Sequence, residues 1–337
     1  MAPAEGYGYA VSRLRAMSGR LLEEAVLQRI LECEDLDSAL KVLGETVYSG
    51  WLMELKGSSE FDKAIEAELL HVYSEVQKFV PDDRLVQLCR LPYDFHNVKV
   101  LMKSAILVRD GGERRFDLLT RLGNISTDDL IMAMESEDYR LIPFGLHGLI
   151  PKCFALWEQT KDIFEVEKTL DSGLFTAMRK IAADCKIDSA VFWVRGKIDA
   201  ENIRNLLRMK RMDMEAGTVA GFLHDGGFIS REKLLSILSE PVESWPRVLS
   251  FTDAAKTFSR VQDAGDLNTL LVDMEKVLDE YIAGMVENSK YKAFAPENVI
   301  SFLWRKELEA KNVRIALVSV SNDTDRSMAR GLLRHAG

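Results

Sequence analysis

The chain has 337 residues, a net charge of −9 and a hydrophobic content of 47%. This composition is typical of a globular protein, and the acidic balance argues against nucleic acid as the main partner. No stretch reaches about 18 uninterrupted apolar residues, so we expect no membrane span. The first eight residues lack a basic region followed by an apolar block, so we expect no signal peptide. The length predicts two or three domains, because one hydrophobic core rarely grows this large.

The common catalytic and nucleotide-binding motifs are missing from the sequence. It contains no GxxxxGK[ST], GxSxG, HExxH or GxGxxG pattern. The four cysteines, Cys33, Cys89, Cys153 and Cys185, are scattered without a CxxC pair, which predicts buried thiols in a reducing cytoplasm. We therefore expect no catalytic residue, no cofactor-binding residue and no metal ligand.

The first third of the chain predicts helices in succession. Residues 9–32 should form a helix with a break at Ser18-Gly19, and a short helix should run from Leu36 to Tyr48. A longer helix is expected from Phe61 to a point before Pro81. The next helix should end at Asp110-Gly111-Gly112, because paired glycines end helices.

The rest of the chain also predicts helices. Ser126 is a candidate N-cap, and Ile229-Ser230 repeats its context after a second Asp-Gly-Gly at 225–227. No proline occurs between Pro151 and Pro241, which favours unbroken helices. Residues 313–320 carry β-branched side chains but follow a helix-forming run without a breaker, so we expect the helix to continue through them. A last short helix is expected near 324–333.

One short pattern recurs three times, at Asp94–Lys103, Asp199–Arg208 and Ala295–Leu303. Apolar residues follow each Asn by one, four and five positions, which is one stripe of a helix. Asp94 and Asp199 are expected to cap these helices, and Pro296 to occupy the first turn. The sequence thus predicts three copies of one capped, amphipathic helix.

A second set of anchors repeats at the same interval. Each copy has an apolar residue followed by Glu, with Leu three positions after that Glu: Ile65-Glu66 with Leu69, Val166-Glu167 with Leu170, and Met274-Glu275 with Leu278. The spacing of roughly 100 residues is that of a small domain and exceeds the period of solenoid repeats. We predict an all-α chain of three related helical modules, at 1–110, 111–225 and 226–337.

The repeated polar residues have two interpretations each. Asn97, Asn202 and Asn298 could form a threefold ligand site, but local bonds to backbone near each helix start are favoured. Lys103, Arg208, Arg305 and Lys306 indicate either a solvated face, which we favour, or a basic surface that meets an acidic partner.

One pair could contribute to a metal site. Glu68 and His71 form an ExxH, which places a carboxylate and an imidazole on one helix face, as in di-iron bundles. Such centres need a second ExxH and two further Glu, and no other histidine has Glu three residues before it. We therefore expect Glu68 and His71 to be an exposed pair.

Several stretches together resemble the C subunit of the archaeal and bacterial V/A-type ATP synthases, whose counterpart in the vacuolar pumps is the d subunit. They are Tyr7–Met17 with Leu21-Leu22, Leu43–Tyr48, Asp94–Val98, Asp199–Ile203 and Lys306–Arg314. The resemblance covers about residues 7–320, and it rests on the order and spacing of these pieces. The chain departs from the family at Ser319-Val320-Ser321, where many members carry Gly-Lys.

The resemblance implies a funnel of three all-helical domains around a pseudo-threefold axis. Its wide mouth would receive the central stalk, and its other end would sit on the cytoplasmic face of the proteolipid ring. The chain would then be a non-catalytic rotor coupling subunit, peripheral to the membrane, with the membrane stator subunit as a further possible partner. It would transmit torque for ATP synthesis or hydrolysis coupled to proton or sodium transport.

Two other functions remain open from the residues alone. One is a helical scaffold that binds a peptide or helix, although such arrays have shorter periods. The other is an enzyme with a helical active site, for which the pair at Glu68 and His71 is the sole indication. The loops Leu141–Phe144 and Glu240–Pro246 are candidate partner contacts, or ordinary connections between helices.

Overall fold

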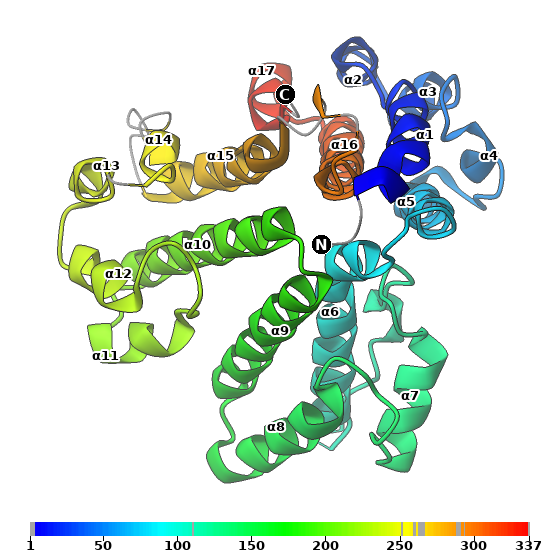
Figure 1. Cartoon of the computed structure of the whole chain (residues 1–337). Coiled ribbons are helices and arrows are strands. Elements are labelled where there is room, and N and C mark those ends of the chain that lie inside the picture. The colour runs from blue at the N-terminus through cyan, green and yellow to red at the C-terminus, as the bar shows by residue number, and fades with distance from the viewer. Residues whose placement is uncertain are drawn as a thin grey trace. The chain divides into compact units, whose positions relative to one another are not determined.

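The computed structural model describes residues 4–109, 111–250, 252–258, 261, 267–287, 291–292 and 294–335. Within these ranges the secondary structure is helical and contains no strand, which confirms the predicted all-α class (Figure 1). The helices are α1 Gly8–Ser18, α2 Glu24–Leu31, α3 Leu36–Leu43, α4 Ser49–Leu52, α5 Phe61–Gln77, α6 Arg84–Arg109, α7 Thr127–Ser136, α8 Leu146–Thr160, α9 Ile163–Cys185, α10 Asp188–Arg211, α11 Ala216–Val219, α12 Arg231–Leu238, α13 Trp245–Val248, α14 Ala255–Phe258, α15 Leu267–Glu287, α16 Glu297–Ser321 and α17 Arg326–Leu332. In this described part of the chain, no helix is long and apolar enough to cross a membrane.

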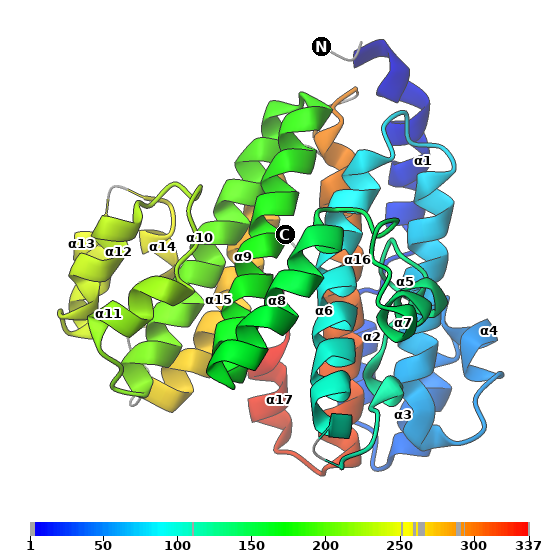
Figure 2. The ribbon, with the colours of Figure 1, turned by 90° about the horizontal axis from the view of Figure 1, so that it is seen from below.

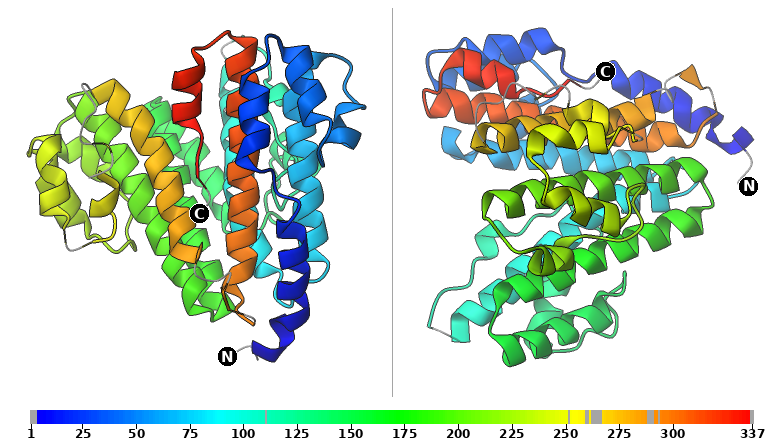
Figure 3. Two further views of the ribbon diagram at one scale, coloured as in Figure 1. Left: turned by 90° about the horizontal axis from the view of Figure 1, so that it is seen from above. Right: turned by 90° about the vertical axis from the view of Figure 1, so that its left-hand side faces the viewer.

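The chain divides into two compact units, residues 83–186 and residues 1–82 together with 187–337. In the first unit, α9 packs along α6, α8 packs on α9, and α7 contacts α6 (Figure 2). In the second unit, α15 packs along α10. There α16, drawn in orange, lies beside α2 and α5 of the N-terminal segment (Figure 3).

The apolar anchors predicted from the repeats all lie in the core. Ile65 and Leu69 of α5, Val166 and Leu170 of α9, and Met274 and Leu278 of α15 are each buried. Burying one aliphatic side chain contributes roughly 1.5–3 kcal/mol, so each of these helices is fixed by its apolar stripe. The division into modules at 1–110, 111–225 and 226–337 stays a prediction.

Most of the predicted helix ends are confirmed. Helix α5 begins at Phe61, and α6 ends at Arg109 before the glycine pair. Ser126 and Ser230 cap α7 and α12, because each hydroxyl accepts a hydrogen bond from an N–H of the first turn. Residues 313–320 lie inside α16, as expected.

The predicted caps at Asp94 and Asp199 are wrong. Helix α6 begins at Arg84 and passes through Pro92, and α10 begins at Asp188, so both aspartates lie in helix interiors. The sequence suggests a start at each aspartate because Asp is a common N-cap residue, and it gives no sign that α6 continues through Pro92. Packing of the long helix against α9 outweighs the lost backbone bond.

Candidate functional site

Two long helices each hold a distant loop through one buried asparagine. Asn97 in α6 donates from Nδ2 to the Thr120 carbonyl over 2.7 Å, and the Thr120 amide donates back to Oδ1 over 2.9 Å. Asn202 in α10 makes the same pair of bonds with His224, at 2.9 and 2.7 Å. Both side chains are fully buried. The expectation of local bonds near a helix start is therefore wrong for these two residues.

The third asparagine of this kind is Asn312, not Asn298. Asn312 in α16 donates to the Arg334 carbonyl and accepts from the Arg334 amide, both over 2.8 Å. Asn298 instead donates to the carbonyls of Ala295 and Lys292 at the start of α16. The local interpretation thus holds for Asn298, which does not make the reciprocal pair of bonds seen at Asn97 and Asn202.

The three asparagines that make reciprocal bonds share a signal in the sequence. An acid stands three residues before each reciprocal asparagine: Asp94 before Asn97, Asp199 before Asn202, and Glu309 before Asn312. Asn298 has Ala295 at that position, although its apolar spacing matches. Periodicity alone therefore does not distinguish Asn312 from Asn298, because any amphipathic helix supplies it.

The two aspartates hold the chain just ahead of a capped helix. Asp94 accepts from the Ile125 amide over 2.8 Å and from the Asn124 side chain over 2.7 Å. Asp199 accepts from the amides of Phe228 and Ile229, at 2.9 and 3.1 Å. These bonds fix where α7 and α12 begin.

Glycine is required beside each of these carboxylates. A Cβ on Gly123 would lie 2.5 Å from Oδ1 of Asp94, and a Cβ on Gly227 would lie closer still to Oδ1 of Asp199. Atoms do not approach so closely, so a side chain at either position would displace the carboxylate. The second Asp-Gly-Gly thus does more than permit a turn.

Burial dominates the ionisation of both aspartates. It raises the pKa of Asp94, and it raises the pKa of Asp199 from 3.8 to about 6, although both carboxylates accept hydrogen bonds that favour the charged form. The native state therefore binds a proton on Asp199 between about pH 4 and 6 that the unfolded state has lost. Its contribution to stability falls as pH rises through this window.

We expect a measurable pH dependence from this group. The unfolding free energy should decrease by up to about 3 kcal/mol between about pH 4 and 7 on account of Asp199. The Asp199→Asn variant should show a flatter profile over the same range, measured by urea denaturation at each pH. An unchanged slope in the variant would mean that Asp199 titrates with its ordinary pKa.

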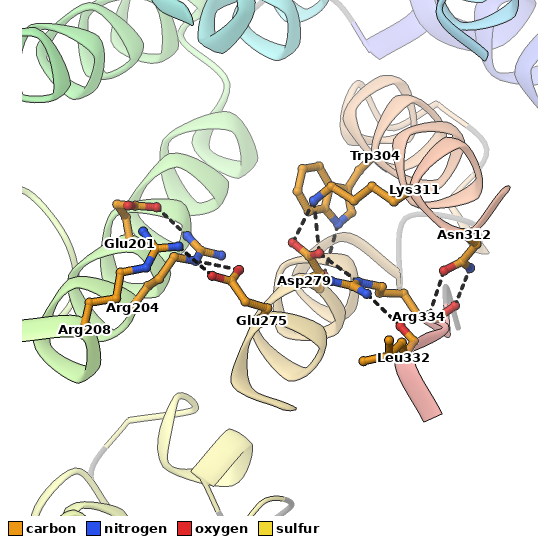
Figure 4. A network of polar contacts seen from close by, with 10 residues as sticks. All are labelled: Glu201, Arg204, Arg208, Glu275, Asp279, Trp304, Lys311, Asn312, Leu332 and Arg334. Carbon is orange, nitrogen blue, oxygen red and sulfur yellow. Dashed lines mark hydrogen bonds and ion pairs between the residues drawn. The ribbon is translucent and has the colours of Figure 1, made fainter. Parts of the chain in front are cut away.

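Two of the predicted basic residues pair with acids on the neighbouring helix. Lys103 contacts Glu167 of α9, and Arg208 pairs with Glu275 of α15 over 2.8 Å. Arg204 also reaches Glu275, and Arg334 and Lys311 both bond Asp279 (Figure 4). These cations are therefore engaged within the chain.

Lys306 is not on a solvated face, contrary to expectation. It is 2% exposed and lies 2.8 Å from a carboxylate oxygen of Glu68 and 2.7 Å from one of Glu309. The indole N–H of Trp51 donates to Glu68, and the Tyr48 hydroxyl donates to Glu309. The two Glu side chains each have several donors, which is what allows three charges to be buried together.

The ExxH pair differs from the prediction in one of its members. Glu68 is buried in the cluster with Lys306, whereas His71 is exposed and lies near Trp51 with ring centroids 5.8 Å apart. Both line a cavity of about 370 Å³ with Lys306 on its wall. Among the described residues, no group of three or more His, Cys, Asp or Glu could hold a metal ion.

The two loops predicted as partner contacts behave differently. Leu141 is 94% exposed, which leaves it available to a partner. Trp245 is fully buried and its indole N–H donates to the Glu240 carbonyl, so it cannot be a surface contact. Mixed apolar and charged residues between two prolines indicate an exposed loop in sequence, but Trp245 begins α13.

Three cysteines are buried as expected, and Cys33 is half-buried.

Comparisons with known proteins point to one family over nearly the whole chain. Residues 10–332 match the model of the ATP synthase (C/AC39) subunit family. The C subunit of the V-type sodium ATPase of Enterococcus hirae is 23% identical over 92% of this chain and 92% of its own length. The C subunits of the A-type ATP synthases of Methanocaldococcus jannaschii and Pyrococcus furiosus are each 24% identical, covering 97% and 95% of this chain and 86% and 88% of their own lengths. The chain therefore belongs to the C/AC39 family, the non-catalytic C subunits of V/A-type ATP synthases.

Proposed function

We propose that this chain is the rotor coupling subunit that joins the central stalk to the proteolipid ring and transmits torque between them. The family match over residues 10–332 carries the proposal. In this role the chain is a funnel of three similar helical domains. It is held at the cytoplasmic face of the membrane by protein contacts, with the membrane stator subunit nearby.

The local structure suits a mechanical part. Long helices α6, α10 and α16 each hold a distant backbone segment through a reciprocal asparagine bond. Dense packing and these reciprocal hydrogen bonds make a body that transmits strain rather than absorbing it. A coupler needs such stiffness and large contact surfaces, and it needs no nucleophile or metal.

A pull-down from membranes tests the partners. Full-length chain with an affinity tag, recovered in mild detergent, should bring down the central stalk subunits and the proteolipid in fixed ratio. Release of the stalk at high salt would identify an electrostatic contact. Recovery of the chain without proteolipid and without stalk would contradict the proposal and favour a helical scaffold with another partner.

A covalent tether tests rotation itself. A photoreactive residue at exposed Leu141 provides a point of attachment on the surface. Because two parts of one rotor do not move relative to each other, a bond to the proteolipid ring should leave ATP hydrolysis coupled, whereas a bond to a stator subunit should stop it. Loss of hydrolysis on tethering to the ring would exclude a rotor role.

A further inference from the structure

We infer that the third repeat is assembled from two distant segments of the chain: residues 297–335 supply its long helix and residues 4–82 supply the rest. Each repeat then begins at a long helix, α6, α10 or α16, and not at residues 1, 111 or 226. The modules are cyclically permuted in the sequence, so the N-terminal and C-terminal segments are binding partners of each other.

The acidic position gives the first evidence. Glu309 stands three residues before Asn312, as Asp94 and Asp199 stand before their asparagines. Its carboxylate accepts from the Leu22 amide over 2.7 Å. Leu22 belongs to the N-terminal segment, 287 residues earlier in the chain.

The register of this bond is the same in all three copies. Leu22 lies two residues before α2, which begins at Glu24. Ile125, bonded by Asp94, lies two residues before α7, and Ile229, bonded by Asp199, lies two residues before α12. Helix α2 therefore takes the place in the third repeat that α7 and α12 take in the other two.

A second long helix packs against each of α6, α10 and α16, and this returning helix gives independent evidence. Helix α9 packs along α6 and α15 along α10, whereas α16 packs against α5 from the other end of the chain. The residue two positions after each reciprocal asparagine is basic, and in each case it pairs with an acid on that returning helix. The pairs are Lys99 with Asp171, Arg204 with Glu275, and Arg314 with Asp62. Asp62, like Leu22, comes from the N-terminal segment.

Polar contacts join the two ends along this interface. Lys306 bridges Glu68 of α5 and Glu309 of α16, and the Tyr73 hydroxyl donates to Glu307. Near α17, the Arg326 guanidinium donates to the Cys33 carbonyl over 3.0 Å. In the 83–186 unit, α6, α7 and α9 follow one another in the chain. The loops that connect them keep them together there, whereas α16, α2 and α5 depend on these polar contacts.

This arrangement has a consequence for a rotor coupling part, and this one step rests on the proposed function. In a module made from residues 4–82 and 297–335, a load on one segment reaches the other through α5 and α16. Opening of this module is then the one event that releases both ends together.

Native-state hydrogen exchange on the full chain tests the inference. Leu22→Pro removes the amide whose hydrogen bond Glu309 accepts. Amides of α16 and α17 should then exchange about tenfold faster or more, together with those of α2 and α5, while amides of α7 to α9 should keep their rates. Glu23→Pro is the matched control, because the φ of −74° at Glu23 already suits proline; it should leave both ends protected.

The reciprocal experiment removes the contact from the other end. Asn312→Ala should speed exchange in α2 and α5 as well as in α16, whereas Asn202→Ala should speed exchange in α10, α12 and α15 and spare α5. If Leu22→Pro and Asn312→Ala each affect only their own end, the two ends are separate modules and the inference is wrong. Neither result depends on partner proteins, so failure here and failure of the pull-down are distinguishable.

Discussion

Replacing Lys306 by methionine is expected to destabilise the chain by about 3–5 kcal/mol, because two buried carboxylates lose their common cation. Glu68 and Glu309 are 5% and 6% exposed, so both carboxylates stay largely shielded from bulk solvent when the ammonium group is removed. Methionine is close to lysine in length, so the volume of the site changes little. The loss therefore measures the charge and not the packing. Urea denaturation followed by circular dichroism gives the change in unfolding free energy.

Two further variants separate this effect from ordinary loss of an ion pair. Arg314→Met removes the pair with Asp62, in which both side chains are about half exposed, and it should cost less than about 1 kcal/mol. Combining Lys306→Met with Glu68→Gln and Glu309→Gln removes all three charges and should recover most of the loss. A Lys306→Met variant as stable as Arg314→Met would show that the cluster is not desolvated.

The sequence predicts elements better than it predicts their partners. Caps at Ser126 and Ser230 follow from local chemistry, since a hydroxyl and the next few amides are enough to form them. The burial of Val166 and Met274 follows from helical periodicity. Each of these features needs information from about one turn of helix, and that information is present in the sequence.

Features that depend on distant segments are not predictable in this way. The roles of Asn97 and Asn202 require loops more than 20 residues away, and the burial of Lys306 requires α5 from the opposite end of the chain. Lysine is rarely buried, so the sequence favours a solvated face. Glu309 and Asn312 share the acid and asparagine spacing of the other two pairs, but their hydrogen bonds to Leu22 and Arg334 become visible only in the structure.

Segments that share few residues make the same pattern of hydrogen bonds at three places in the chain. Aspartate at two copies and glutamate at the third accept an amide at the same register, although Glu309 has one more methylene. The residues that bond to the asparagines, Thr120, His224 and Arg334, have nothing in common as side chains. They use their backbone groups, so the repeat constrains the asparagine and leaves its partner free to vary.

Replacing Asn202 by alanine is expected to cost about 4 kcal/mol, because it leaves both the amide and the carbonyl of His224 buried without their partners. Each buried backbone group left unsatisfied costs roughly 1–3 kcal/mol, and the cavity adds to this. His224 itself is 6% exposed, so water has little access to these groups. Thermal and urea unfolding of the purified chain measure the loss.

Asn205→Ala is the matched control on the same helix. Asn205 lies about one turn further along α10 and donates one hydrogen bond of 3.0 Å, from Nδ2 to the Phe222 carbonyl, in a half-buried position. Its removal should cost about 1 kcal/mol, the net value of one ordinary hydrogen bond. Equal losses for Asn202→Ala and Asn205→Ala would mean that the reciprocal bond is worth no more than a single one. The three reciprocal asparagines would then be no stronger as mechanical joints than an ordinary hydrogen bond.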